Sequence, residues 1–139
     1  MAVYQGQLAD KRGLYAGRGI RWLILAVWAG LLMGVTVGSL LPAASPWMQV
    51  VCRLHVSDKV LHFCAYFALA LLPVVGFRDG RRGMLVGLSM FVVGLALEAS
   101  QQLAPGRSVE FRDVLANGAG VGCGALLGLP VRIWIAFFL

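Results

Sequence analysis

Charged residues are scarce in this chain. Asp, Glu, Lys and Arg account for 13% of its 139 residues, whereas hydrophobic residues account for 60%, and the mean hydropathy is +0.82. Soluble domains carry about 25% charged residues and roughly 45–50% apolar ones. The composition therefore excludes an ordinary soluble domain and indicates an integral membrane protein.

Cysteine is also rare, and its spacing excludes the common metal and redox motifs. Cys52, Cys64 and Cys123 form no C-x-x-C pair. Cys64 and Cys123 lie inside apolar segments, where we expect each to be a small buried hydrophobe. The chain also lacks the ordered Ser-His-Asp pattern of hydrolases and a phosphate-binding glycine loop. We therefore assign no metal ligand and no cofactor.

What the chain does contain is four apolar segments long enough to cross a bilayer. The first, residues 22–41, has no charged residue and covers about 30 Å of hydrocarbon at about 1.5 Å per helical residue. The others span about residues 58–77, 83–103 and 113–131. The sequence predicts an all-α fold, an integral membrane four-helix bundle that occupies residues 1–139 as a single domain.

Basic residues flank these segments unevenly, which predicts the orientation of the bundle. One side receives eight of the twelve, namely Lys11, Arg12, Arg18, Arg21, Arg78, Arg81, Arg82 and Arg132. The other side receives Arg53, Lys59, Arg107 and Arg112. Because cytoplasmic loops are enriched in Lys and Arg, both termini should face the cytoplasm. The net charge of +6 forms no continuous basic patch, so we expect no nucleic-acid partner.

Each of the last three segments has a pair of polar residues at a spacing of four, which places both on one helical face. The pairs are Asp58 and His62, Glu98 and Gln102, and Asp113 and Asn117. If successive segments cross the bilayer in alternate directions, all three pairs lie at the extracytoplasmic face. Ionisable residues within membrane segments are energetically costly and usually functional, so we predict a polar site at headgroup depth.

The residue types at this site indicate acid–base chemistry and anion binding. Glu98, His62 and Asp113 are the candidate catalytic residues, because each can donate or accept a proton. The candidate ligand-binding residues are Asp58, Lys59, Tyr66, Gln101, Arg107 and Asn117. Among these, Lys59 and Arg107 offer charged donors to a phosphate or carboxylate. Three carboxylates and a histidine could also hold a divalent cation, although their spacing is not diagnostic.

Simpler structural roles compete with function at several of these positions. Asp58 and Asp113 both stand where a helix N-cap is expected, and Lys59 could extend its ammonium group to the interface. Glu98 has no such alternative, because it lies inside the apolar end of its segment. A carboxyl group there must be paired or neutral, so Glu98 makes the strongest case for a site.

Small residues at a spacing of four predict close helix packing in two segments. The last segment has Ala116, Gly120, Gly124 and Gly128, and the first has Gly30, Gly34 and Gly38. We therefore expect the first and last helices to be partners. These glycine-rich faces also leave open a homo-oligomer or another membrane partner.

The polar residues occur in three ordered stretches. These are Asp58-Lys59-x-x-His62-Phe63-x-x-Tyr66, Glu98-x-x-Gln101-x-x-x-Pro105-Gly106-Arg107 and Asp113-x-x-x-Asn117-x-x-Gly120. Together they resemble the motifs of the VanZ-like family, small membrane proteins named for a factor associated with teicoplanin resistance. The resemblance covers residues 58 to about 128. It implies a helical, multi-pass protein of the bacterial inner membrane linked with cell-envelope functions and glycopeptide resistance, without a defined biochemical activity.

We expect a site that recognises or processes the polar headgroup of a membrane lipid or a lipid-anchored envelope precursor. Whether the chain is an enzyme stays open. One alternative is a non-catalytic accessory or resistance factor, in which the polar cluster only locks three helices together. Another is a proton-coupled transporter, which the almost wholly apolar cytoplasmic halves of the segments disfavour.

Overall fold

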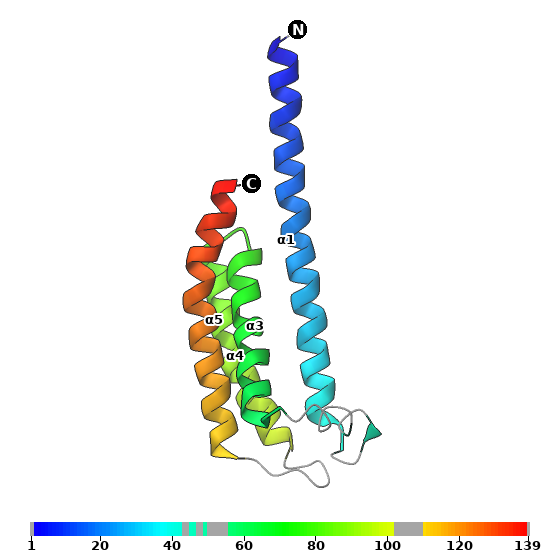
Figure 1. Ribbon diagram of the computed structural model, residues 1–139, viewed down its shortest axis with the longest axis vertical. Coiled ribbons are helices and arrows are strands. Elements are labelled where there is room, and N and C mark those ends of the chain that lie inside the picture. Colours follow the sequence, from blue (N-terminus) through cyan, green and yellow to red (C-terminus); the bar gives the residue numbers. More distant parts are fainter. Residues whose placement is uncertain (1, 43–44, 47–48, 50–55, 102–109, 139) are drawn as a thin grey trace.

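The computed structural model describes residues 2–42, 45–46, 49, 56–101 and 110–138. These residues form four long helices and no strand (Figure 1). The helices are α1 (Ala2–Leu40), α3 (Asp58–Gly76), α4 (Gly80–Gln101) and α5 (Phe111–Phe138). The prediction of an all-α, four-helix fold is confirmed.

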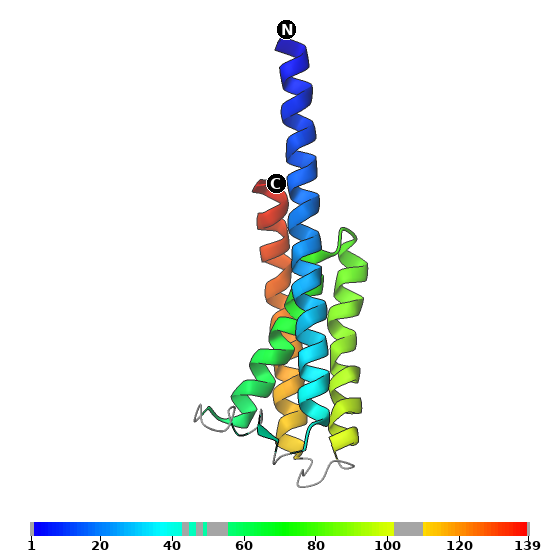
Figure 2. The ribbon, with the colours of Figure 1, turned by 90° about the vertical axis from the view of Figure 1, so that its right-hand side faces the viewer.

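Each helix contains a stretch that is long and apolar enough to cross a membrane. These stretches are Gly17–Leu40, Asp58–Gly76, Gly80–Gln101 and Phe111–Ile135. Large apolar side chains such as Leu23, Val92 and Leu126 are exposed on the outside of the bundle, as expected where lipid replaces water. The chain is therefore a multi-pass membrane protein. Both termini lie at one end of the bundle, and α1 extends beyond the other helices there (Figures 1 and 2).

Helix α3 occupies the centre of the bundle, and the glycines of α5 pack against it. A Cβ atom added to Gly120 would lie 2.5 Å from the carbonyl oxygen of Phe63, and one added to Gly128 would lie 2.8 Å from Cβ of Val74. Gly124 meets the carbonyl oxygen of Phe67 in the same way. Small residues allow this close backbone approach, which supplies the packing energy that lipid cannot supply.

The predicted pairing of the first and last helices is wrong. Gly30, Gly34 and Gly38 of α1 face open space, and α1 packs on α3 and α4 instead. The physical reason is that the glycine ridge of α5 is already filled by the backbone of α3. A spacing of small residues predicts that a helix can be approached closely, but it does not specify the approaching helix.

Helix α1 is attached to α3 through a carbonyl group that a proline leaves free. Pro73 lies inside α3 and has no N–H, so the carbonyl oxygen of Leu69 loses its usual helical donor. The indole Nε1–H of Trp28 on α1 donates to this oxygen at 3.0 Å. Nearby, Gly76 admits Leu25 of α1, whose Cδ2 would lie 2.9 Å from an added Cβ. These contacts fix the position of α1 on the bundle.

The expected burial of Cys64 and Cys123 is wrong. Both are free cysteines with exposed side chains. Both cysteines lie in the predicted apolar segments, but on the faces of the helices that point away from the bundle. An exposed position in such a segment is compatible with a weakly polar thiol, because the surroundings there are apolar as well.

Candidate functional site

The start of α3, the end of α4 and the start of α5 lie at the end of the bundle opposite the termini (Figure 1), and polar side chains of the three helices meet there. His62 of α3 lies between the other two helices: its Nδ1 is 2.9 Å from Oδ1 of Asn117 on α5 and 3.4 Å from Oε1 of Glu98 on α4. Asn117 in turn donates from Nδ2 to Oε1 of Glu98 at 3.3 Å. Each helix therefore contributes one member to a closed polar triangle.

The direction of these hydrogen bonds assigns a tautomer to His62. Because the amide nitrogen of Asn117 donates to Glu98, its oxygen is free to accept from His62. Nδ1 of His62 therefore bears the hydrogen in the neutral ring, and Nε2 has the free lone pair. Nε2 faces Asp58, whose Oδ2 lies 3.7 Å away. That distance exceeds a hydrogen bond, so the lone pair is available to another group.

Burial increases steadily from the mouth of this cluster to its base. The side chain of Asp58 is 64% exposed and that of His62 is 16% exposed, while that of Glu98 is only 4% exposed. At the base, Oε2 of Glu98 accepts no hydrogen bond from any described residue. A buried carboxylate oxygen without a donor is costly. Glu98 therefore has unused capacity for a proton or for a hydrogen bond from a ligand.

A second set of charges lies beside His62, around Lys59. Its ammonium group is 2.7 Å from Oε2 of Glu110 and 3.4 Å from Oδ1 of Asp113. The hydrogen bond from Lys59, together with its charge, holds the pKa of Glu110 below its usual range. Asp113 is 5% exposed, and its Oδ1 lacks a hydrogen bond of good geometry within the described part. The charge of Lys59 is thus already compensated by two carboxylates.

Tyr66 and Gln101 border the cluster on α3 and α4. Tyr66 is buried with Leu69 and Ala70 in the apolar core, one turn deeper than His62. Gly94 makes room for its ring, because a Cβ added to Gly94 would lie 2.8 Å from Cε1 of Tyr66. Gln101 is 4% exposed. Tyr66 therefore lies where the polar cluster meets the apolar interior, whereas Gln101 is the last residue of α4, one turn nearer the end of the bundle than Glu98.

A sequence model of the VanZ/LLP1 family matches residues 18–134. The chain belongs to the VanZ/LLP1 family. The match confirms the predicted resemblance and extends it from the polar stretches to the membrane-spanning part of α1. Comparisons with curated proteins and with solved structures give no match.

For this member of the VanZ/LLP1 family, the structure places most of the predicted site residues at one location. It brings Asp58, Lys59, His62, Glu98, Asp113 and Asn117 together, with Tyr66 and Gln101 buried beside them. Arg107 and Gln102 lie outside the described residues.

The sequence interpretation missed Glu110, which pairs with Lys59 from 51 positions away. In the sequence, Glu110 is an acidic residue just before an apolar segment, and this position alone does not indicate Lys59 as its partner.

The interpretation of Asp58 and Asp113 as N-cap residues is wrong, because each lies inside its helix and not at the position before it. Helix α3 begins at Asp58, with Ser57 at the N-cap, and α5 begins at Phe111, ahead of Asp113. Both carboxylates instead lie in the first helical turn. Negative charge there interacts favourably with the helix dipole, which gives the aspartates a structural role without capping.

The cluster can support proton transfer, and it could also hold a cation. His62 presents Nδ1 to Asn117 and buried Glu98, and it presents Nε2 to exposed Asp58 at 3.7 Å. The ring can therefore take up or release a proton on either side. Ligand atoms of Asp58, His62 and Asp113 all lie within 4.8 Å of one another. These residue types suit a divalent cation, and Asn117 would orient the histidine as an outer partner.

Proposed function

We propose that this VanZ/LLP1 protein recognises or processes the polar headgroup of a lipid-anchored or cell-envelope molecule. The site lies at the extracytoplasmic face of the bacterial inner membrane in the predicted topology. The observation that supports this proposal most is the graded path from exposed Asp58 through His62 to buried Glu98. This gradient of exposure would bring a ligand group from the headgroup layer next to an acid–base pair.

The chemistry of the cluster defines the ligand groups that would fit. Within the described residues, Glu98 Oε2 has no hydrogen-bond donor, so it suits an O–H or N–H group of the ligand. Nε2 of His62 is free to accept a proton from such a group. A phosphate on the same ligand would draw Lys59 from Glu110 and Asp113, or contact Arg107. The expected headgroup therefore combines hydroxyl or amine groups with an anionic group.

A functional test compares single variants in a strain that lacks the gene. Glu98→Gln removes the acid–base group while keeping the shape and the amide contact to Asn117, and His62→Ala and Arg107→Ala remove the other two groups. We expect each variant to insert normally and to lose the phenotype of the intact gene, measured as survival in a glycopeptide and as the envelope-precursor lipid profile. The matched control is Ser89→Ala, because the one hydrogen bond of the Ser89 side chain within the described part of the chain is to the backbone of its own helix α4. Full activity of all three site variants would contradict the proposal.

The closed triangle of His62, Glu98 and Asn117 also favours a second function, that of a non-catalytic accessory factor. In that case the triangle only holds α3, α4 and α5 together. The same variants separate the two functions. A structural triangle predicts that Glu98→Gln lowers the melting temperature and the cellular amount of protein, whereas a ligand site predicts normal amounts with lost activity. Catalytic residues usually tolerate such changes because active sites are rarely optimised for stability.

A further inference from the structure

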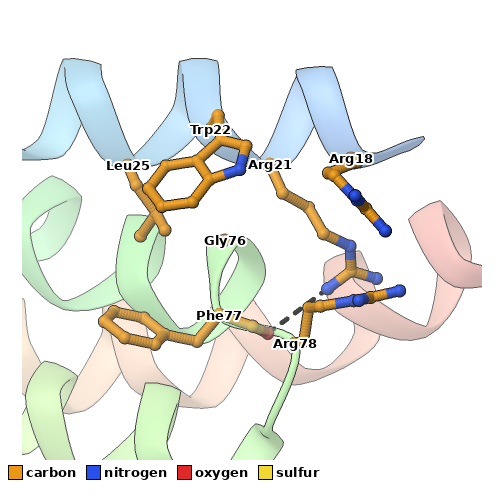
Figure 3. Close-up of a pocket in the computed structure, with 7 residues that line it drawn as sticks. All are labelled: Arg18, Arg21, Trp22, Leu25, Gly76, Phe77 and Arg78. Atoms are coloured by element: carbon orange, nitrogen blue, oxygen red, sulfur yellow. Dashed lines mark hydrogen bonds between the residues drawn. The ribbon is translucent and has the colours of Figure 1, made fainter. Parts of the chain in front are cut away.

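The end of the bundle that bears the termini contains a basic pocket. Arg18 and Arg21 approach it from α1, and Arg78 approaches it from the turn after α3 (Figure 3). Trp22, Leu25 and Phe77 form its apolar wall, and its volume is about 410 Å³. None of these residues belongs to the polar cluster at the opposite end. The basic pocket is therefore distinct from the polar cluster.

One nearby arginine has a clear structural role. Arg132 of α5 donates from Nη1 to the carbonyl oxygen of Val74 at 3.1 Å and also bonds the carbonyl oxygens of Phe77 and Arg78. These are carbonyl groups at the end of α3 that lack helical donors. Arg132 thus completes the C-terminus of α3, and its donors are used.

The three pocket arginines are not neutralised in this way. Within the described residues, Arg21 makes one hydrogen bond, to the carbonyl oxygen of Phe77 at 3.3 Å (Figure 3). No carboxylate there forms an ion pair with Arg18, Arg21 or Arg78. The described carboxylate at this end, Asp79, pairs with Arg82 at 3.4 Å. Three guanidinium groups therefore converge without a counter-charge from the described part of the chain.

Convergent cations at the edge of a membrane favour an anionic ligand. Arginine forks match the oxygen atoms of phosphate, and basic pockets between membrane helices suit the headgroups of anionic lipids. The pocket lies where the spans Gly17–Leu40 and Asp58–Gly76 reach their ends, which is the depth of lipid phosphates. Its apolar wall of Trp22 and Leu25 continues toward the hydrocarbon.

We propose that this pocket binds the phosphodiester group of an anionic phospholipid from the surrounding bilayer. Arg18, Arg21 and Arg78 contact the phosphate, and the acyl chains lie along Trp22 and Leu25. The bound lipid fills the space between α1 and the turn that joins α3 to α4. It therefore fastens α1 to the rest of the bundle at the basic end, independently of the ligand at the polar cluster.

Native mass spectrometry of the full chain in detergent can test this proposal. The probes are phosphatidylglycerol, phosphatidylcholine with the same acyl chains, and inorganic phosphate. We expect phosphatidylglycerol to bind in preference to phosphatidylcholine. Arg18→Gln should weaken this binding about fivefold, since one arginine near an anionic headgroup contributes about 1 kcal/mol. The double variant Arg18→Gln/Arg21→Gln should weaken it by more than about tenfold.

The matched control is Arg81→Gln, which removes one charge from an exposed residue at the same end but outside this pocket. It should leave phosphatidylglycerol binding within about twofold of the starting value. Equal weakening by Arg18→Gln and Arg81→Gln would overturn the proposal, because it would indicate general attraction to positive charge. Displacement of the lipid by millimolar inorganic phosphate would also overturn it, since free phosphate would then be the ligand. Arg18→Gln makes this test independent of folding, because Arg18 lies at the pocket rim and forms no ion pair in the described part.

Discussion

At the scale of single residues, His62 and Asn117 determine how the polar cluster works. Asn117 is 1% exposed and links the other two members of the triangle, since it accepts from His62 and donates to Glu98. An amide is suited to this position because it provides both a donor and an acceptor without a charge. The same amide leaves His62 Nε2 unprotonated in the neutral ring, which directs the basic nitrogen toward the mouth of the site.

We expect Asn117→Ala to lower the free energy of unfolding by about 1–3 kcal/mol, because it leaves two buried polar partners unsatisfied. The measurement is thermal unfolding in detergent, with Ser100→Ala as the control. Among the described residues, Ser100 bonds only to the backbone oxygen of Ala96 in its own helix, at 2.7 Å. A double variant His62→Ala/Asn117→Ala should lose less than the sum of the two single losses. Additive losses would show that His62 and Asn117 do not interact.

At the scale of elements, the α3–α5 interface depends on glycine at particular positions. Gly120, Gly124 and Gly128 all face the backbone or Cβ atoms of α3. Gly122, on the same helix, has no atom within 4 Å of an added Cβ. Gly122 therefore differs from the other three glycines only in its surroundings, since all four are in the same helix and have the same intrinsic helix propensity.

Gly124→Ala should destabilise the bundle by about 1–3 kcal/mol, because the added methyl group meets the carbonyl oxygen of Phe67 and forces the helices apart. Gly122→Ala should be neutral or slightly stabilising, since alanine favours the helix and the space is open. Melting temperatures of the two variants in the same detergent provide the comparison. Equal melting temperatures would show that α3 and α5 are not held by this close approach.

At the scale of the whole molecule, the two ends of the bundle differ in chemistry. The end with the termini has Arg18, Arg21, Arg78 and Arg132, whereas the opposite end has the buried carboxylates of Glu98 and Asp113. Basic residues favour the cytoplasmic side during insertion. The polar cluster should then face the outside, as the proposed recognition of an envelope headgroup requires.

A topology reporter fused after Leu139 should therefore be active only in the cytoplasm. The paired control is the same reporter inserted in the segment between α4 and α5, which should be active only on the other side. Replacement of the basic residues at the termini by glutamine should weaken this orientation, since the bias in Lys and Arg determines it. Exterior activity of the terminal fusion would place the polar cluster in the cytoplasm.

Much of the fold followed from the sequence, because a long apolar segment can satisfy its own backbone hydrogen bonds in a bilayer by forming a helix. The ridge positions of His62, Glu98 and Asn117 followed from helical spacing as well. The partners across helices did not. The Lys59–Glu110 pair, the Trp28–Leu69 hydrogen bond and the partner of the α5 glycines each depend on how helices are arranged around α3. Helical periodicity describes one helix at a time and contains no such information.

The order of the triangle's members along the chain has a consequence for biogenesis. Asn117 follows Glu98 by 19 positions and His62 by 55, so both earlier residues leave the ribosome before their shared partner exists. Polar groups within membrane segments are unfavourable while they remain unpaired. The polar groups of α3 and α4 therefore gain their shared partner only once α5 has been synthesised. We expect the three helices to reach their final packing only after the last span has entered the membrane.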